Sequence, residues 1–301
     1  KPLHDAAKIL RVVVSTYQTA IKLGQEWYDQ FGAIFVDEAH GATSASIPTL
    51  LGMTGHMLYH AGFTGTLNGT HMHELEMRAR FGEVTKLVTT RELMDMGIVA
   101  QLQINSITLV HSEQVAKDSV KWKYPDEIEY LINLKERNDF LATLASSHDE
   151  NVMILFNRVE HGRVLHELIS KQIEGTDKVI FYVDGNVAIA DRKPIRALME
   201  SRKGCILLAS FGTSSVGLSI KNIHHMVLGH PFKDRVRVLQ TIGRGLRLHP
   251  TKKSVEVVDV GDKLSGKRKK VNSTYDHFLS RLELYQGEEF NYDVITLELS
   301  Q

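Results

Sequence analysis

The sequence lacks several features that would mark a particular class of protein. Its 301 residues include one cysteine, Cys205, which excludes a disulfide within the chain and a zinc site built from several cysteines. No apolar run reaches the roughly 18 residues of a membrane-spanning helix. We therefore expect a globular protein of a reducing cytoplasm that has no membrane partner.

An excess of one charge is also absent. Lys and Arg together number 36, as do Asp and Glu, so the formal net charge is zero. Because proteins that bind nucleic acid through a broad basic surface usually carry excess positive charge, any such binding must depend on local groups. The first residues, KPLHDAAK, resemble no signal peptide and include no initiating Met, so we expect a fragment of a longer protein.

Short apolar segments rich in β-branched residues alternate with amphipathic helical patterns. The predicted strands are 11–16, 33–36, 104–110, 152–156, 178–183, 205–210, 224–229 and 254–260. The clearest helical patterns are 137–148, 162–173 and 191–202. Strands that are apolar on both faces and are separated by helices indicate a largely parallel sheet covered on both sides. The sequence therefore predicts an α/β fold.

The distribution of these segments predicts two domains and a tail. Residues 1–99 hold too few strands for a complete doubly wound domain, so we expect this domain to be truncated at its N-terminus, whereas residues 100–262 hold at least five. Residues 263–301 would form a basic link and a short helical extension, with a helix over 273–286 that is capped by Ser273 or Thr274.

Acidic groups follow the predicted strand 33–36, in the sequence AIFVDEAH. Ligands of open parallel sheets bind at the carboxyl ends of the strands. There, Asp37 could hold hydrated Mg²⁺, and Glu38 could orient or deprotonate a water that attacks a γ-phosphate. An arbitrary Asp-Glu pair would more often be a solvated strand end, but VDEAH after AIF is far more specific.

A second stretch, QTIGRGLRLHP, supplies the opposite charge. If it is helical, Gln240, Arg244 and Arg247 share one face, and two guanidiniums suit a triphosphate. A solvated basic helix face is the alternative. Gly243 and Gly245 are poor helix formers, so they suggest the close approach of another surface.

Five motifs in order resemble those of superfamily 2 helicases. They are VDEAH (motif II), GFTGTL at 62–67 (motif III), VMILFNRVEHG at 152–162 (motif IV), ILLASFGTSSVGLSIKNIHHMVL at 206–228 (motif V) and QTIGRGLR at 240–247 (motif VI). The segments 12–32, 80–99, 217–228 and 278–292 are similar to recombination helicases of T-even phages. The resemblance implies two RecA-like domains, an ATP-dependent activity on nucleic acid, and roles in recombination, repair and replication.

The resemblance also implies roles for individual residues in ATP hydrolysis. Asp37 would hold Mg²⁺ through water and Glu38 would be the catalytic base. The second domain would contribute a nucleotide-binding glycine, an amide and two arginine fingers: Gly217, Gln240, Arg244 and Arg247. One departure from the common pattern is Ser219, where other subfamilies often have an acid. A ribose-binding role at that position is therefore doubtful.

Further roles concern nucleic acid. The residues that would relay the nucleotide state to the nucleic-acid groove are His40, Thr64 and Thr66. The residues that would line the track for the nucleic-acid backbone are Thr16, Gln18, Arg158 and Ser210. The cofactors would be ATP and Mg²⁺, and the partner would be branched or duplex DNA or an RNA-DNA hybrid, with a monomer favoured. A restriction-type duplex translocase and an ATP-independent nucleic-acid-binding module remain alternatives.

The glycine-rich phosphate loop of such motors is missing from the sequence. No Gly-Lys-Ser/Thr precedes Asp37, and the near match GDKLSGKR at 261–268 has Arg268 in place of the hydroxyl residue. That segment also follows motif VI rather than preceding motif II. We therefore expect that the parent protein is an ATPase and that this chain alone is not.

A group of histidines offers a different interpretation. His56, His60, His71 and His73 lie close in sequence, and HMLYH has the spacing of two zinc ligands on a helix. The sequence HExxH would also supply a glutamate, which is absent here. For His224 and His225, beside a predicted strand, a structural role is the favoured interpretation.

Overall fold

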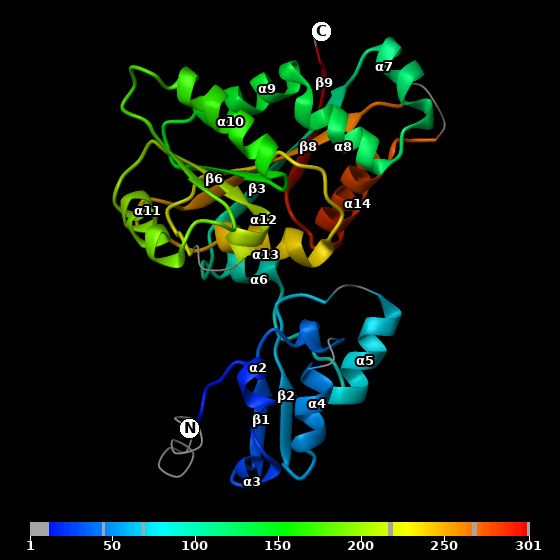
Figure 1. Ribbon diagram of the computed structural model, residues 1–301, viewed down its shortest axis with the longest axis vertical. Helices are drawn as coiled ribbons and strands as arrows, with labels where there is room; N and C mark the ends of the chain where they lie inside the picture. Colours follow the sequence, from blue (N-terminus) through cyan, green and yellow to red (C-terminus); the bar gives the residue numbers. More distant parts are fainter. Residues whose placement is uncertain (1–11, 44–45, 68–69, 216–218, 267–269, 300–301) are drawn as a thin grey trace. The chain divides into compact units, whose positions relative to one another are not determined.

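The computed structural model describes residues 12–43, 46–67, 70–215, 219–266 and 270–299. The chain divides into two compact units, Lys1–Leu87 (unit 1) and Val88–Gln301 (unit 2), which are described separately below (Figure 1). This division lies before the predicted boundary near residue 100. The reason is that Met94, in helix α6 (Thr90–Asp95), is buried in the core of unit 2.

Unit 1 contains a small parallel sheet and short helices. Its elements are α2 (Tyr17–Ala20), α3 (Gln25–Tyr28), β1 (Ala33–Val36), the 3₁₀ helix η1 (Ala39–Thr43), α4 (Ser46–Met53), β2 (Tyr59–Gly62) and α5 (His71–Phe81). Strand β1 pairs in parallel with β2, with Ala33 opposite Tyr59. The strand predicted at 33–36 is confirmed, whereas residues 12–16 are not a strand and β2 was not predicted.

The two faces of this small sheet differ. Val36 packs with Ile47 and Met77, so one face is covered by helices. On the other face, Phe35 and Tyr59 are each 67% exposed. The prediction that residues 33–36 are buried on both faces is therefore wrong for Phe35, because the described part of unit 1 places no apolar cluster over that side chain.

Unit 2 contains a seven-stranded sheet in the order β5-β6-β4-β7-β8-β3-β9. Its strands are β3 (Gln101–Val110), β4 (Val152–Phe156), β5 (Val179–Val183), β6 (Cys205–Ser210), β7 (His225–Leu228), β8 (Ser254–Lys263) and β9 (Tyr292–Glu298). Every pairing is parallel, and the first six of these strands coincide with predicted ones. The predicted parallel α/β sheet is confirmed.

Helices cover both faces of this sheet (Figure 1). The helices of unit 2 that follow α6 are α7 (Glu113–Asp118), η2 (Ser119–Lys121), α8 (Tyr124–Asn133), α9 (Lys135–Ser146), α10 (Val159–Gln172), α11 (Ile189–Ser201), α12 (Phe211–Ser215), α13 (Arg235–Gly245) and α14 (Ser273–Gly287). Helices α9 and α10 pack on the face that carries Ile154 and Phe156, and α11 and α13 pack on the face that carries Leu155. Because both faces are covered, the central strands are almost wholly apolar.

The C-terminal tail is an integral part of unit 2. Helix α14 confirms the predicted helix, but β9 joins the sheet beside β3, so the tail is more than a helical extension. The predicted cap is wrong as well. The N-cap residue is Asn272, and the buried carboxylate of Glu127, from α8, accepts hydrogen bonds from the backbone N–H groups of Ser273 (2.9 Å) and Thr274 (2.7 Å).

Candidate functional site

The acidic residues of the VDEAH sequence lie directly after β1, at its carboxyl end. Asp37 and Glu38 are both exposed, and the Asp37 Oδ1 accepts a hydrogen bond from the Glu38 backbone N–H at 2.9 Å. Glu38 has φ 52°, in the left-handed region that residues other than glycine rarely adopt. Such conformations cluster at functional sites, where the surrounding contacts hold them in place.

His40 connects this acidic strand end to the segment after β2. Its Nδ1 lies 3.0 Å from Thr64 Oγ1 and 3.1 Å from a carboxylate oxygen of Glu38. The Thr64 hydroxyl in turn donates to the carbonyl of Thr66 at 2.8 Å. The structure thus brings together the three residues expected to relay the nucleotide state, and it places them next to Glu38.

Backbone contacts hold the two strand ends in register. The Phe63 N–H donates to the Val36 carbonyl at 2.8 Å, and the Ala39 N–H donates to the Phe63 carbonyl at 2.9 Å. A Cβ at Gly62 would lie 2.8 Å from that of Ala39, so the close approach requires glycine. His73, from α5, supports the turn because its Nε2 donates to the His40 carbonyl at 2.9 Å.

The donor set at this strand end fits a hydrated Mg²⁺ ion. The exposed Asp37 carboxylate accepts a hydrogen bond from a neighbouring backbone amide, and hard oxygen ligands are those that Mg²⁺ prefers. Magnesium usually keeps several of its waters and binds only one or two carboxylates. The phosphate-holding part of such a site is missing, because the sequence contains no Gly-Lys-Ser/Thr.

The basic residues of QTIGRGLR lie at the end of α13 in unit 2. Gln240 and Arg244 are half-buried and helical, but the helix ends at Gly245, so the prediction of one helical face is wrong for Arg247. Arg247 instead donates through Nη1 to the hydroxyl of Ser219. That contact joins the motif V segment to the motif VI segment.

The two glycines of this stretch have different surroundings. A Cβ at Gly245 would collide with the side chain of Met226 in β7, which confirms the predicted close approach at this position. At Gly243, no side chain or backbone atom of another described segment lies within 4 Å of the corresponding point, so the described residues give no close approach there. Gly245 therefore allows the end of α13 to lie against the sheet.

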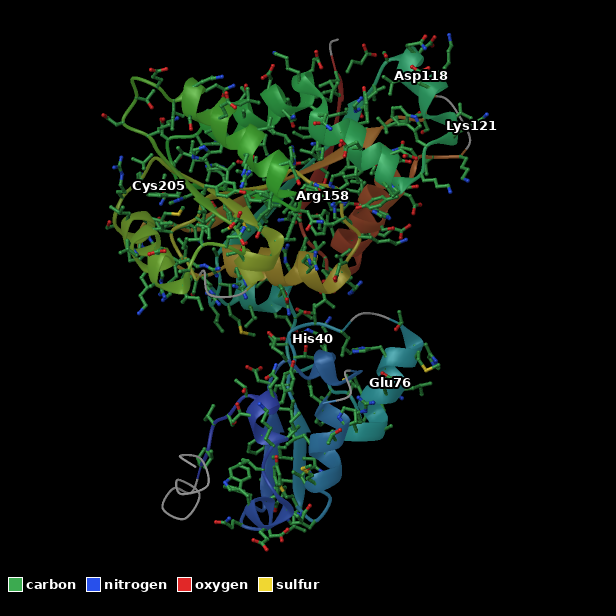
Figure 2. All side chains as sticks on the ribbon, in the orientation of Figure 1. His40, Glu76, Asp118, Lys121, Arg158 and Cys205 are labelled. Carbon is green, nitrogen blue, oxygen red and sulfur yellow. The ribbon has the colours of Figure 1, made fainter. Side chains whose placement is uncertain are left out.

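The four residues expected to line a nucleic-acid track occupy strand ends and helix starts. Thr16 and Gln18 are exposed around the first residue of α2. Arg158, labelled in Figure 2, is exposed between β4 and α10. Ser210 ends β6, so both residues lie at the carboxyl edge of the unit 2 sheet. Gly217, the expected nucleotide-binding glycine, lies outside the described residues.

An open cleft of about 420 Å³ adjoins Ser210. Its lining includes Thr213, whose Oγ1 lies 2.7 Å from Ser210 Oγ, and Arg192, which donates to the Val187 carbonyl at 2.8 Å. Sequence analysis missed both residues. Thr213 is part of motif V and could have been found there, whereas Arg192 lies in an ordinary amphipathic helix that gives no such signal.

The histidines of the alternative zinc site, His56, His60, His71 and His73, do not come together as metal ligands. His56 lies in a turn and His60 in β2, so HMLYH is not helical. Their Nε2 atoms contact the carbonyl oxygens of Tyr28 (3.2 Å) and Thr54 (2.8 Å). Within the described ranges, these histidines take part in no group of three side chains that could bind a metal ion, so the structure does not support the alternative zinc interpretation.

Comparisons with known proteins bear on the helicase resemblance. No protein-family profile matches the chain. The chain is 37% identical over 300 residues to the ATP-dependent DNA helicase uvsW of Enterobacteria phage T4, an alignment that covers 96% of this chain and 59% of that helicase. The crystal structure of T4 UvsW matches with a TM-score of 0.58 at 34% identity, over 96% of this chain and 58% of that chain. The resemblance to superfamily 2 helicases is confirmed.

Solved structures with much lower sequence identity share the fold of this chain. The ATP-dependent Type ISP restriction-modification enzyme LlaBIII, solved bound to DNA, matches 94% of this chain with a TM-score of 0.65 at 12% identity, over 23% of its own length. Identity this low shows the fold alone. The chain spans a little under three-fifths of the T4 helicase. Among the described residues, no helix has both the length and the apolar character needed to cross a membrane.

Proposed function

We propose that this chain carries motifs II, III, IV, V and VI of an ATP-dependent DNA helicase. The observation that supports this most is the arrangement around His40, whose Nδ1 lies within 3.1 Å of both Thr64 and Glu38. An acidic strand end that is joined by a histidine to a second strand end is suited to passing a change at a phosphate to the rest of the domain. A pair of solvated acids would not need that histidine.

The proposed chemistry at the strand end divides between two carboxylates. Mg²⁺, when bound with ATP, neutralises the charge of the transferred phosphoryl group. Asp37 would hold this ion through water. Glu38 would orient the attacking water and accept its proton, and the His40 contact would fix the direction of the Glu38 carboxylate.

Arg244 and Arg247 are the proposed arginine fingers, and Gln240 is a proposed polar organiser beside them. A guanidinium that reaches the γ-phosphate stabilises the charge of the transition state, which is worth about 10³- to 10⁵-fold in rate. The contact between Arg247 and Ser219 gives the guanidinium a defined resting position in unit 2. We propose that ATP draws it away from Ser219.

The proposed partner is DNA, branched or duplex, or an RNA-DNA hybrid. Arg158, Ser210 and the cleft beside Ser210 lie together at the carboxyl edge of the unit 2 sheet, where polar groups can contact a phosphate backbone without reading its sequence. Roles in recombination, repair and replication rest on similarity to the T4 helicase. A strand-displacement assay against a triplex-displacement assay would separate a helicase from a duplex translocase.

These 301 residues alone are not expected to hydrolyse ATP, because they contain no loop that holds the β- and γ-phosphates. The gene sequence upstream of Lys1 tests this directly. A Gly-Lys-Ser/Thr loop in the same reading frame would support a motor, whereas a gene that begins near Lys1 would favour an ATP-independent nucleic-acid-binding module.

The activity test uses the natural gene product and the variant Glu38→Gln. We expect ATP binding to be retained and ATP hydrolysis to fall at least about 100-fold, because the general base is lost while the charge of Asp37 remains. Glu83→Gln is the matched control, since Glu83 is an exposed carboxylate of the same unit. Wild-type hydrolysis by Glu38→Gln would refute the assignment.

A further inference from the structure

A cluster of metal-ligating side chains lies in unit 2 and includes none of the residues proposed above to act on ATP or nucleic acid. His148, in the loop after α9, meets His225, the first residue of β7, and Glu256, the third residue of β8. One nitrogen or oxygen of each lies within 4.8 Å of the others. We propose that these three side chains bind a divalent transition-metal ion of the Zn²⁺ type.

The cluster lies at the opposite end of the sheet from Arg158 and Ser210, although His225 belongs to the motif V segment. His225 pairs with Glu256 across β7 and β8 near the amino ends of these strands, opposite the edge that carries Arg158 and Ser210. Strand alternation places His225 on the face of Val227, which α9 and α10 cover, whereas α13 packs on the face of Met226. The cluster and the motif VI helix therefore lie on different faces of the sheet.

The ligand chemistry suits zinc. Two imidazoles and one carboxylate are a donor set that binds Zn²⁺ and leaves a position for water or a fourth ligand. Glu150 could orient the His225 ring, because its Oε2 lies 3.9 Å from Nε2, the ring nitrogen that does not face Glu256. Asn105 donates to Glu256 Oε1, and a hydrogen bond of this kind commonly orients a ligating carboxylate.

His148 is the ligand that must move most. Its ring stacks on that of His225, with centroids 3.6 Å apart and planes 18° apart, so the lone pairs of the two rings do not yet converge. No described residue hydrogen-bonds to its ring nitrogens, and it lies in the loop between α9 and β4 rather than in a strand. A rotation of this side chain would bring its nitrogen to about 2.0 Å from a metal held by His225 and Glu256, the usual Zn–N distance.

Metal binding would replace the hydrogen bond of 2.8 Å between His225 Nδ1 and Glu256 Oε2. The proton that this bond now holds would leave to solvent, because a ligating nitrogen must present its lone pair. The ion would then tie together the α9–β4 loop, β7 and β8. Its role is structural, so it does not depend on the proposed ATPase.

The test is calorimetric titration of the chain with Zn²⁺ after removal of bound metals by EDTA. We expect one ion per chain, and we expect the Kd to rise at least about tenfold in His148→Ala and in Glu256→Gln. His71→Ala is the matched control, because it removes an exposed histidine outside the cluster and should leave the Kd unchanged. Circular dichroism of each variant establishes that it is folded.

A second readout is the visible absorption of Co²⁺, which is intense when the ion is tetrahedral with nitrogen and oxygen ligands. If Glu256→Gln fails to fold, the His148→Ala variant still tests the proposal. His148 lies in a loop, so its replacement should not disturb the sheet. The proposal is overturned if the chain shows no saturable binding of Zn²⁺, or if His148→Ala binds Zn²⁺ as tightly as the wild-type chain does.

Discussion

The two units differ in how strongly their sheets hold the residues that follow the strands. Each places polar residues directly after parallel strands. In unit 2 those strands belong to a seven-stranded sheet whose central side chains are fully buried on both faces, whereas in unit 1 they belong to a two-stranded sheet with Phe35 and Tyr59 each 67% exposed. The position of Ser210 is therefore set by a core, and that of Glu38 mainly by the hydrogen bonds of His40 and its neighbours.

Two phenylalanines, each near the carboxyl end of its strand, offer the sharpest test of this difference. Phe156 in β4 is fully buried and its ring fills the space beside Gly162, whereas Phe35 in β1 is mostly exposed. Phe156→Ala should lower the free energy of unfolding of unit 2 by about 3–5 kcal/mol, because it leaves a cavity. Phe35→Ala should lower that of unit 1 by less than about 1 kcal/mol.

The two tryptophans allow each unit to be followed separately. Trp27 is in the core of unit 1, and Trp122 is partly buried in unit 2. Urea unfolding recorded by tryptophan fluorescence, in Trp27→Phe and Trp122→Phe backgrounds, reports unit 2 and unit 1 respectively. An effect of Phe35→Ala as large as that of Phe156→Ala would contradict the proposed difference in support.

Acid should weaken unit 2 through a buried histidine. Burial, and after it Arg137 and Arg158, lower the pKa of His230 to about 3, whereas an unfolded histidine titrates near about 6.5. Between these values the unfolded state binds more protons, so stability is full above about pH 6.5 and falls as the pH drops, by up to about 1.4 kcal/mol per pH unit. His230→Asn should reduce this slope between about pH 5.5 and 6.5. The measurement is urea unfolding followed by Trp122 fluorescence at several pH values. If the unfolding free energy of His230→Asn falls with pH as steeply as that of the wild-type chain, the prediction is wrong.

A smaller loss of unfolding free energy is expected when the N-terminus of α14 loses its contact with Glu127 of α8. Glu127 is 2% exposed and accepts from the backbone N–H groups of Ser273 and Thr274. Glu127→Gln keeps the shape but removes the charge, so unit 2 should lose about 1–2 kcal/mol of unfolding free energy. The exposed Glu113→Gln, at the start of α7, is the control and should cost less than about 0.5 kcal/mol.

The buried strands were predictable because each of them is a continuous run of apolar residues in the sequence. VMILF and CILLAS are apolar at nearly every position, which only a strand covered on both faces requires. Strand β9 gave no such signal, since it is an edge strand with mostly exposed side chains. Residues 12–16 have strand-like composition without a strand pairing, because composition records local preference and not the presence of a partner.

The candidate site was predictable to a similar, partial extent. The acidic box and its link to Thr64 follow from motif order, which sequence displays. The end of α13 before Arg247 depends on tertiary contacts near Gly245, and the cap from Glu127 joins residues far apart in the chain. The grouping of His148, His225 and Glu256 has the same origin, because the register of β7 and β8 and the position of the loop after α9 bring these residues together.

The central proposal is that Glu38 of unit 1 and Arg247 of unit 2 are both required for ATP hydrolysis. Steady-state ATP hydrolysis by the natural gene product decides it, with Glu38→Gln, Arg247→Ala and the double variant measured side by side, and Arg196→Ala as an exposed control in unit 2. The account predicts that each single variant loses at least about 100-fold and that the double variant is hardly slower than either, because residues that act as a unit are strongly non-additive. Wild-type hydrolysis by Arg247→Ala, or independent multiplying losses in the double variant, would contradict it.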